Sequence, residues 1–346
     1  MEKEIMSFAD QEIANRLSKR HHFLSDVDQL INWKRILKVL NHVDLKRQSV
    51  AGRDSFSPEV MFRIMLIQSW YNLSDYQMEE QLFYNVRFLW FSHLSLENPV
   101  PDHSTICRWR GRFSEKGIYE KLFHEINTQL QKHSISIHAG AIVDATLVES
   151  HARPRKKVII ETEPVGDDEI PDQVTFQPTE LKVIESADPD ARWIKKGKKS
   201  TYGYKGHAVV DKEYGTVQGI LVTPASKYDG HMLIPLIEEM GLPEGTEVLA
   251  DKGYRSQDNE RELEEKKLVS RIMQKKKKNQ EMDIETADFN HRISTQRYKV
   301  ERTFGCLKKH FGWGRSIYMG LKKTTDYLIL GAIAFNLKRS LSIIRT

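Results

Sequence analysis

The sequence predicts an α/β protein in which a mixed sheet flanked by helices follows an all-helical N-terminal domain. Residues 10–135 show the apolar spacing and start signals of helices, whereas short apolar runs typical of strands alternate with helical segments after residue 136. A chain of 346 residues is long enough for two domains. We therefore expect a helical domain over residues 1–135 and an α/β domain over residues 136–346.

Helix start signals are recognisable in the N-terminal domain. Residues 57–59 read Ser-Pro-Glu, which places an N-cap before a proline in the first turn. Ser74 and Gln77 have the spacing of a capping box, and Asp102 can cap a helix over residues 104–113. That last helix is the candidate for DNA recognition, because it carries Arg108, Arg110 and Arg112.

The DNA-recognition helix does not fit a helix-turn-helix, in which the second helix follows a tight turn and enters the major groove. The gap from Tyr84 to Asp102 is too long for that turn. We expect a domain that binds DNA or mediates dimerisation. A purely helical packing domain is the alternative.

The second domain is predicted to contain three strands, a helix, a strand, a helix, a strand and two helices, in that order. Gly215 lies in the turn of the hairpin that joins the second and third strands. The predicted strands are 137–149, 206–210, 216–222, 246–251 and 268–273, and the helices are 229–240, 258–267, 294–310 and 327–341. This order of elements is that of an RNase H-like core.

An insertion of about fifty residues, 150–201, separates the first two predicted strands. Residues 161–190 hold ten acidic side chains and one cation, Lys182, after which the segment turns basic. Such a composition buries little apolar surface, so we expect a flexible insertion, with ordering on DNA as the alternative. Lys275–Lys278 has two similar interpretations, a solvated loop or a DNA contact.

Two aspartates, Asp144 and Asp251, lie within or at the end of predicted strands. Asp144 interrupts the apolar run 139–148, so it is set into a buried strand and needs a partner there. Asp251 ends the run 247–250, where a strand gives way to a loop. Ligand sites in open α/β sheets favour the carboxyl edge of the strands, so we expect Asp251 at that edge.

Glu301 lies in the predicted helix 294–310. At about 100° per residue, Arg297 and Lys308 fall within roughly 40° of Glu301 on one helix face. A separate apolar stripe would dock the helix on the sheet and consists of Ile293, Val300, Phe304, Leu307 and Phe311. The structural alternative is an ordinary amphipathic helix with an intrahelical Arg297–Glu301 pair.

Together, the three carboxylates have the chemistry of a phosphodiester-transfer site. Two Mg²⁺ ions about 3.5 to 4 Å apart can activate an oxygen nucleophile and stabilise a leaving 3′ oxygen. Mg²⁺ prefers oxygen ligands and keeps several waters, so two or three shared carboxylates suffice. We expect Asp144 to bridge the ions, with Asp251 on one and Glu301 on the other, and Mn²⁺ to be able to replace Mg²⁺. Arg297 and Lys308 would then meet the phosphate.

Several motifs carry a family resemblance. They are Val143-Asp144-Ala145-Thr146, residues 202–207 with 222–225, residues 250–254, and Arg297 to Lys308, preceded by residues 70–75 and 101–106. In this order they resemble the DDE transposases of bacterial insertion sequences, in the branch named after insertion sequence 5. The likeness covers most of residues 20–340. It implies an RNase H-like catalytic core, Mg²⁺ dependence and action on the ends of the element's own DNA.

The motif around the third acid departs from the family at one position. Related transposases often show Tyr-x2-Arg-x3-Glu-x6-Lys, and here Ser294 occupies the Tyr position. Tyr298 falls near +60° from Glu301, so it does not replace that Tyr. The resemblance therefore carries over Arg297, Glu301 and Lys308 but not the Tyr.

Positive charge concentrates beside the third acid. The formal net charge is +5, but residues 292–323 hold nine Lys or Arg against one acid, Glu301. Such a stripe suits a DNA backbone, whose phosphates dominate affinity. A solvated helix face is the alternative, although such faces normally interleave both signs. Besides the three arginines of residues 104–113, the predicted DNA or phosphate contacts are Arg297, Arg302, Lys308, Lys309, Lys205 and His207.

His207 has two interpretations. By alternation along the second strand region, His207 and Asp211 are expected on the same side of the sheet as Asp144. An auxiliary role of His207 in metal or phosphate binding then stands beside that of a hydrogen-bonded structural histidine.

The cysteines and the hydropathy of the chain indicate where in the cell the protein is expected. Cys107 and Cys306 have no metal spacing and are expected to be reduced thiols. The first residues lack the apolar core of a signal peptide, and the longest apolar run, 327–335, is too short to span a bilayer. We expect a cytoplasmic, nucleoid-associated protein without a membrane partner.

The sequence therefore predicts a transposase that hydrolyses and joins phosphodiester bonds at the ends of an insertion sequence. Two alternatives stay open: an RNase H-like nuclease that cuts without joining, and a catalytically silent, transposase-derived regulator that binds DNA. The expected DNA partners are the terminal inverted repeats and the target. Joining two ends implies at least a homodimer in the working complex.

Overall fold

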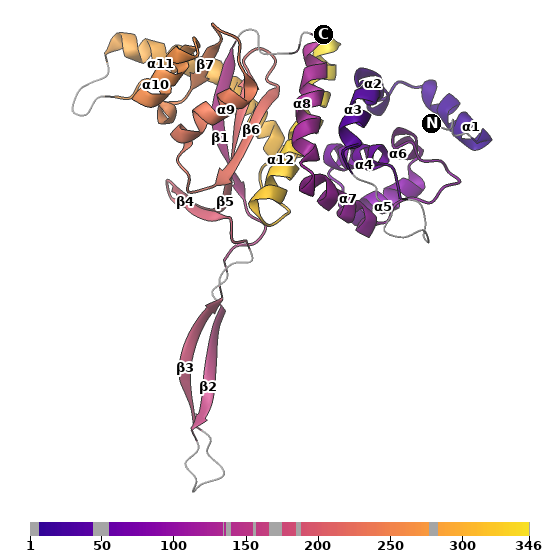
Figure 1. Cartoon of the computed structure of the whole chain (residues 1–346), viewed down its shortest axis with the longest axis horizontal. Coiled ribbons are helices and arrows are strands. Elements are labelled where there is room, and N and C mark those ends of the chain that lie inside the picture. Colours follow the sequence, from indigo (N-terminus) through magenta and orange to yellow (C-terminus); the bar gives the residue numbers. More distant parts are fainter. Residues whose placement is uncertain are drawn as a thin grey trace.

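The computed structural model describes residues 7–43, 55–133, 135, 140–154, 157–165, 175–184, 188–276 and 283–345. A cluster of helices forms one side of the molecule and a mixed sheet with its own helices forms the other (Figure 1). Helices α8 and α12 lie where the two sides meet. The predicted boundary at residues 135 and 136 falls at a segment, 136–139, that lies outside the described residues.

The N-terminal side is helical, as predicted. Ser57 accepts from the Val60 N–H, Ser74 and Gln77 form a complete capping box, and Asp102 accepts from the Thr105 N–H. The three expected helix starts are therefore confirmed. The helices are α1 Phe8–Ser18, α2 Phe23–Leu30, α3 Trp33–Leu40, α4 Pro58–Tyr71, α5 Asp75–Tyr84, α6 Val86–Phe91, α7 His103–Glu115 and α8 Ile118–Gln131.

The central sheet has the topology of an RNase H-like core. Its strands are β1 Ala141–Glu149, β4 Arg192–Lys196, β5 Lys199–Asp211, β6 Val217–Pro224, β7 Glu247–Ala250 and β8 Val269–Ile272. The first three core strands β1, β5 and β6 pair antiparallel, whereas β7 pairs parallel with β1 and β8 pairs parallel with β7. The order β6-β5-β1-β7-β8 puts β1 at the centre, so the predicted fold class is confirmed. Residues 137–139 of the predicted first strand lie outside the described residues.

Helices cover both faces of the sheet. One face packs on α9 Leu233–Met240, where Leu233 and Ile237 join Val143 and Val209 in one apolar cluster. Helix α10 Gln257–Glu265 contributes Leu263 to the same cluster. The other face packs on α11 Ile284–His310 and α12 Leu321–Ile344. All five residues of the predicted apolar stripe on α11 are buried there, as expected: Ile293, Val300, Phe304, Leu307 and Phe311.

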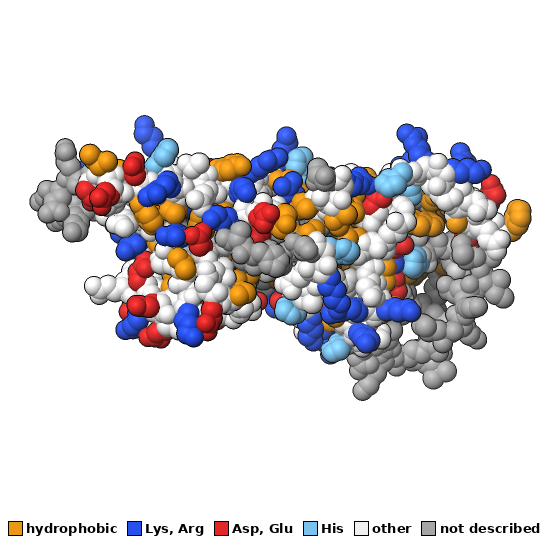
Figure 2. Space-filling model, turned by 90° about the horizontal axis from the view of Figure 1, so that it is seen from above, with side chains coloured by type: hydrophobic (Ala, Val, Ile, Leu, Met, Phe, Trp, Pro, Cys, Tyr) orange, Lys and Arg blue, Asp and Glu red, His pale blue; other side chains and the backbone are white. Residues whose placement is uncertain are grey.

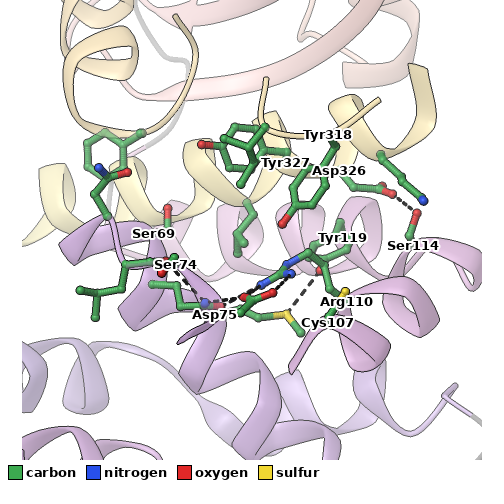
Figure 3. Close-up of a pocket in the computed structure, with 18 of the residues that line it drawn as sticks. Ser69, Ser74, Asp75, Cys107, Arg110, Ser114, Tyr119, Tyr318, Asp326 and Tyr327 are labelled. Carbon is green, nitrogen blue, oxygen red and sulfur yellow. Dashed lines mark hydrogen bonds and ion pairs between the residues drawn. The ribbon is translucent and has the colours of Figure 1, made fainter. Parts of the chain in front are cut away.

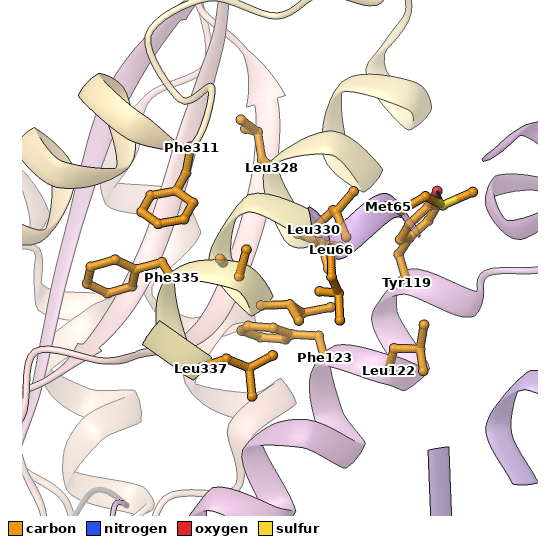
Figure 4. Packing of buried hydrophobic residues seen from close by; sticks show 14 of the residues in the cluster. Met65, Leu66, Tyr119, Leu122, Phe123, Phe311, Leu328, Leu330, Phe335 and Leu337 are labelled. Atoms are coloured by element: carbon orange, nitrogen blue, oxygen red, sulfur yellow. Dashed lines mark hydrogen bonds between the residues drawn. The ribbon is translucent and has the colours of Figure 1, made fainter. Parts of the chain in front are cut away.

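Helix α12 connects the two sides of the molecule. It packs against β6 of the sheet and against α4 and α8, and Figure 4 shows its apolar side chains beside those of α4 and α8. The Trp70 indole N–H donates to the Ala334 carbonyl at 2.9 Å, and the Asn336 amide donates to Asn127 and Val217. By length and composition α12 could cross a membrane, but most of it is buried inside the protein.

The insertion between the first two core strands contains regular structure that composition did not predict. β2 Lys157–Val165 and β3 Thr175–Ile184 form an antiparallel hairpin that projects from the sheet (Figure 1), and β4 pairs with β5. Trp193 of β4 faces Tyr202 across this pair, with ring centroids 5.3 Å apart. The acidic composition hid short β-branched runs such as Val158-Ile159-Ile160. Residues 155–156, 166–174 and 185–187 lie outside the described part of the insertion.

Candidate active site

Asp144 and Asp251 lie side by side at the centre of the sheet. The parallel register pairs Val143 of β1 with Ala250 of β7. The residue that follows each of these in the chain is an aspartate, Asp144 or Asp251. Val143 and Ala250 both point into the α9 side, and the alternation of a strand turns the residues that follow toward α11. Two carboxylates from separate segments therefore share one region of the α11 face.

Arg297 holds the first of these carboxylates. Its Nη2 donates to Asp144 Oδ2 at 2.8 Å, and the side chains are 11 and 21% exposed. Arg297 thus pairs with Asp144 and not with Glu301, against the intrahelical alternative. Arg297 Nε is buried and, among the described residues, has no hydrogen-bond partner.

The pKa of Asp144 is raised above its usual value of 3.8. Burial is the largest cause and the Asp251 carboxylate adds to it, while Arg297 and the Ala145 N–H oppose it. Burial and a neighbouring like charge both disfavour the ionised form. A cation placed between the two aspartates would favour ionisation of both.

The turn after β7 shapes the position of Asp251. Asp251 caps the short helix η2 Lys252–Tyr254, and its Oδ1 accepts from the Gly253 N–H. The Tyr254 side chain is buried, and its pKa is raised by burial and by the carboxylates of Asp144, Asp229 and Asp251. Asp251 therefore lies at the carboxyl edge of β7, where the sequence placed it.

Glu301 lies one turn beyond Arg297 on α11 and is exposed. Within the described ranges, no three Asp, Glu, His or Cys side chains are close enough together to hold a metal ion. The aspartate pair nevertheless fits a hard divalent cation, because both groups are carboxylates on rigid, adjacent segments. Ser294 and Tyr298 are both exposed on α11.

Exposed cations follow α11 away from the aspartates. Arg302 and Lys309 are exposed, as expected of DNA contacts. Lys308 is exposed too, and its pKa is lowered by partial burial and by Lys196 and Lys199. Figure 2 shows Lys and Arg side chains along the face of the molecule seen from above.

Lys205 and His207 do not form part of a DNA surface in this structure. His207 pairs with Ala145 and not with Asp144, so it points to the α9 side of the sheet, as does Asp211. The expectation that both share a side with Asp144 is wrong, because the strand register shifts the alternation by one residue. Lys205 and His207 are 7 and 0% exposed.

The interior surroundings of these two residues are polar. Lys205 Nζ lies 2.7 Å from Asp229 Oδ1, and His207 Nε2 lies 2.9 Å from the Thr223 hydroxyl. Burial lowers the pKa of His207 to about 4, so it is neutral at neutral pH. His207 therefore has the surroundings of a structural histidine, the second of its two interpretations.

The three arginines of α7 differ in their surroundings. Arg108 and Arg112 are exposed, whereas Arg110 donates to both oxygens of Asp75 at 2.6 and 2.9 Å and to Gln68. Figure 3 shows this pair beside an apolar cavity of about 560 Å³ between the helical side and α12. Arg110 therefore holds α7 to α5 and is not presented to DNA, which corrects the expectation for this residue.

Parts of the predicted DNA surface fall outside the described residues. Lys275 donates to the Arg255 carbonyl at 2.8 Å and Lys276 is exposed, but Lys277 and Lys278 lie outside the description. Three residues around the site were not singled out from the sequence: Tyr228, Tyr254 and Asn259. Tyr254 belongs to a recognised motif, whereas Tyr228 and Asn259 are identified only by their contacts in space.

An RNase H-like sheet with paired carboxylates on its central strands defines the class of metal-dependent nucleases and polynucleotidyl transferases. Comparison with known families narrows this class. Residues 11–112 match the transposase domain DUF772, and residues 136–337, more than half of the chain, match the transposase DDE domain. The protein belongs to the DDE transposase family.

One solved structure gives a weaker similarity. It is a cryo-EM structure of piggyBac transposase in a synaptic complex with hairpin DNA. The TM-score is 0.47 at 10% sequence identity, and the match covers 93% of this chain and 75% of that one.

Proposed function

We propose that this transposase hydrolyses and joins phosphodiester bonds at the ends of an insertion sequence of the insertion-sequence-5 branch. Asp144, Asp251 and Glu301 are its proposed catalytic carboxylates. The observation that supports this most is the adjacent placement of Asp144 and Asp251 on β1 and β7, with Arg297 paired to the first. Glu301 is included because it lies on α11, one turn beyond Arg297.

Members of the DDE domain family generally use divalent metal ions. Our proposal for this chain is two Mg²⁺ ions, replaceable by Mn²⁺, held by the three carboxylates. Bound there, such ions activate an oxygen nucleophile and stabilise the leaving 3′ oxygen. Arg297 holds Asp144 in one orientation, and its proposed contact with a phosphate is made beside that carboxylate.

The proposed DNA path runs along α11. Arg302, Lys308 and Lys309 contribute exposed cations to it, and Arg108 and Arg112 contribute cations from α7. The proposed partners are the terminal inverted repeats, the target DNA and a second copy of the chain, because two ends must be joined. Work on chromosomal DNA would place the protein at the nucleoid.

A strand-transfer assay on element-end DNA with Mg²⁺ tests the proposal. We expect cleaved ends and joint products from the wild-type chain. Nicks without joint products would favour a nuclease, and binding without any cleavage would favour a regulator. Either result would contradict the proposed function.

Asp144→Asn gives the matched variant for this assay. It removes one negative charge from the aspartate pair but keeps the shape of the side chain. We expect it to abolish cleavage and joining while DNA affinity stays at the wild-type value. Joining by a metal-free preparation of the wild type would contradict the metal-dependent account.

A further inference from the structure

The turn that follows Asp251 is tied down on the α9 side of the sheet. Asn259 of α10 is 6% exposed, and its side-chain amide donates to the Tyr254 carbonyl at 2.6 Å and to the Gly230 carbonyl at 2.9 Å. The Tyr228 hydroxyl donates to the Gly253 carbonyl at 2.6 Å. Two consecutive residues of the turn are thus fastened to the segment 228–230.

The segment 228–230 is itself fixed from the sheet. Lys205 donates from β5 to the Lys227 carbonyl at 2.6 Å and lies 2.7 Å from Asp229 Oδ1. A buried ammonium is stable only with such partners, so this contact holds the segment in one place. Gly230 permits the close approach, since a Cβ there would lie 2.5 Å from the Tyr228 ring and 3.1 Å from the Gly253 carbonyl.

These contacts determine how the Asp251 carboxylate is presented. β7 is four residues long and ends before Asp251, so the sheet alone does not orient that side chain. The Gly253 N–H occupies Asp251 Oδ1, and the position of Gly253 therefore decides where Oδ2 points. Hydrogen bonds behind a metal ligand commonly set its orientation and its affinity for the ion.

We propose that Asn259 is a positioning residue for Asp251, and that Tyr228 and the Lys205–Asp229 pair hold the segment through which it acts. This inference rests on the proposed function, since it takes Asp251 as a metal ligand. It gives Lys205 a structural role in the site, in place of the DNA contact expected from the sequence. It also links both faces of the sheet, because Asn259 lies on the α9 side and Asp251 serves the α11 side.

Asn259→Asp tests the proposal with the full-length chain. The substitution keeps the shape of the side chain but removes both N–H donors at neutral pH. We expect the Mn²⁺ dissociation constant, measured by calorimetry without DNA, to rise about 10- to 100-fold. The Mg²⁺ concentration for half-maximal cleavage should rise by a similar factor, and the cleavage rate at saturating Mg²⁺ should change less.

Asn127→Asp is the matched control. Asn127 is also 6% exposed, and its amide donates to the Val217 carbonyl between α8 and β6, away from Asp251. A purely structural effect would lower the melting temperature in both variants and leave Mn²⁺ binding unchanged in both. Folded Asn259→Asp protein with wild-type Mn²⁺ affinity would overturn the proposal.

Tyr228→Phe tests the same positioning of Asp251 if the Asn259→Asp variant does not fold. Tyr228 is 52% exposed, so loss of its hydroxyl should not endanger the fold. One lost hydrogen bond should weaken Mn²⁺ binding roughly 2- to 10-fold. Tyr71→Phe, at 47% exposure on the helical side, should leave Mn²⁺ binding unchanged. An unchanged Mn²⁺ affinity in Tyr228→Phe would overturn the proposal.

Asp251→Asn separates this inference from the function on which it rests. If wild type and Asp251→Asn bind Mn²⁺ equally, Asp251 is not a ligand and both proposals are wrong. If binding is lost in Asp251→Asn but kept in Asn259→Asp and Tyr228→Phe, only the positioning role is wrong. Loss in Asp251→Asn with graded weakening in the other two variants supports both.

Discussion

Arg297 has a contact in the structure that the sequence did not predict. Beside its proposed contact with a phosphate, it lies 2.8 Å from Asp144, a residue 153 positions away in the chain. Its charge opposes the burial and the like charge that raise the pKa of Asp144. Arg297 thus favours the ionised form of Asp144, which is the form that a metal ligand requires.

Arg297→Gln should therefore shift the pH dependence of cleavage. Without the guanidinium, the pKa of Asp144 rises further, so the acid limb of the pH–rate profile should move to higher pH. The measurement is the cleavage rate at saturating metal between pH 5 and 9. Arg302→Gln, an exposed change one turn away on α11, should leave the limb in place. An unshifted limb in Arg297→Gln would contradict this role.

His207 makes a prediction about stability. Its pKa in the folded chain is about 4, against 6.5 in an unfolded chain, so protons bind the unfolded state more readily. The stability of the neutral form is therefore fully present above pH 6.5 and is lost as the pH falls toward 4. Between pH 7.5 and 5 the loss should be about 2 kcal/mol.

His207→Gln should remove this loss, because Gln does not titrate. The free energy of unfolding in urea at the two pH values gives the measurement, and the exposed change His133→Gln is the control. Equal pH dependence in wild type and His207→Gln would show that His207 is not buried in its neutral form.

Site residues could be predicted from the sequence only where their roles depend on local pattern. Asp144 was predictable because it interrupts an apolar run typical of a buried strand, and Asp251 because it comes directly after such a run. The error about the side on which His207 lies comes from strand register, which shifts the alternation by one residue and is not encoded locally. Lys205 contacts Lys227 and Asp229, more than twenty residues along the chain, which no local pattern indicates. Arg110 was misplaced because its partner, Asp75, lies 35 residues away.

At the scale of elements, helix α11 packs on the sheet through one face and exposes cationic side chains on another. Its apolar stripe is buried on the sheet, and Arg302 and Lys309 remain exposed. The helix and its apolar stripe were predictable from the sequence, because the 3.6-residue spacing of apolar residues is a local pattern. The β2–β3 hairpin was not predicted, because its acidic composition outweighed its short apolar runs.

The exposed cations of α11 should control the salt dependence of DNA binding. Replacing Arg302 and Lys309 together by Gln should weaken binding and reduce the slope of log K against log salt concentration by roughly 2, since each phosphate contact releases about one counterion. Titrations at several salt concentrations give this slope. Arg261 and Lys267, exposed cations on the α10 side, form the matched control pair. An equal change in both pairs would mean a general effect of charge and no DNA path along α11.

At the scale of the whole molecule, α12 makes the two predicted domains depend on one another. It contacts α4 and α8 on one side and β6 on the other, and the Trp70–Ala334 and Asn336–Asn127 hydrogen bonds cross the junction. The domain boundary predicted from the sequence marks a change of secondary structure. We propose that it does not mark a boundary between units that fold independently.

Thermal unfolding of the full chain should therefore show one transition. Calorimetric and van't Hoff enthalpies should agree, as expected when both sides unfold together. Trp70→Phe, which leaves the Ala334 carbonyl without its indole donor, should lower the free energy of unfolding by about 1 kcal/mol and keep the single transition. Two separate transitions in the wild type would contradict the shared role of α12.

Asp251 is the proposed metal ligand beside Asp144. Asp251→Cys tests this role, because a thiolate is a poor ligand for Mg²⁺ and a better one for softer ions. We predict that this variant neither cleaves nor joins element-end DNA with Mg²⁺ and that Mn²⁺ restores part of both activities, while Asp251→Asn stays inactive with either ion. Full activity of Asp251→Cys with Mg²⁺, or of Asp251→Asn with either ion, would show that Asp251 is not a metal ligand.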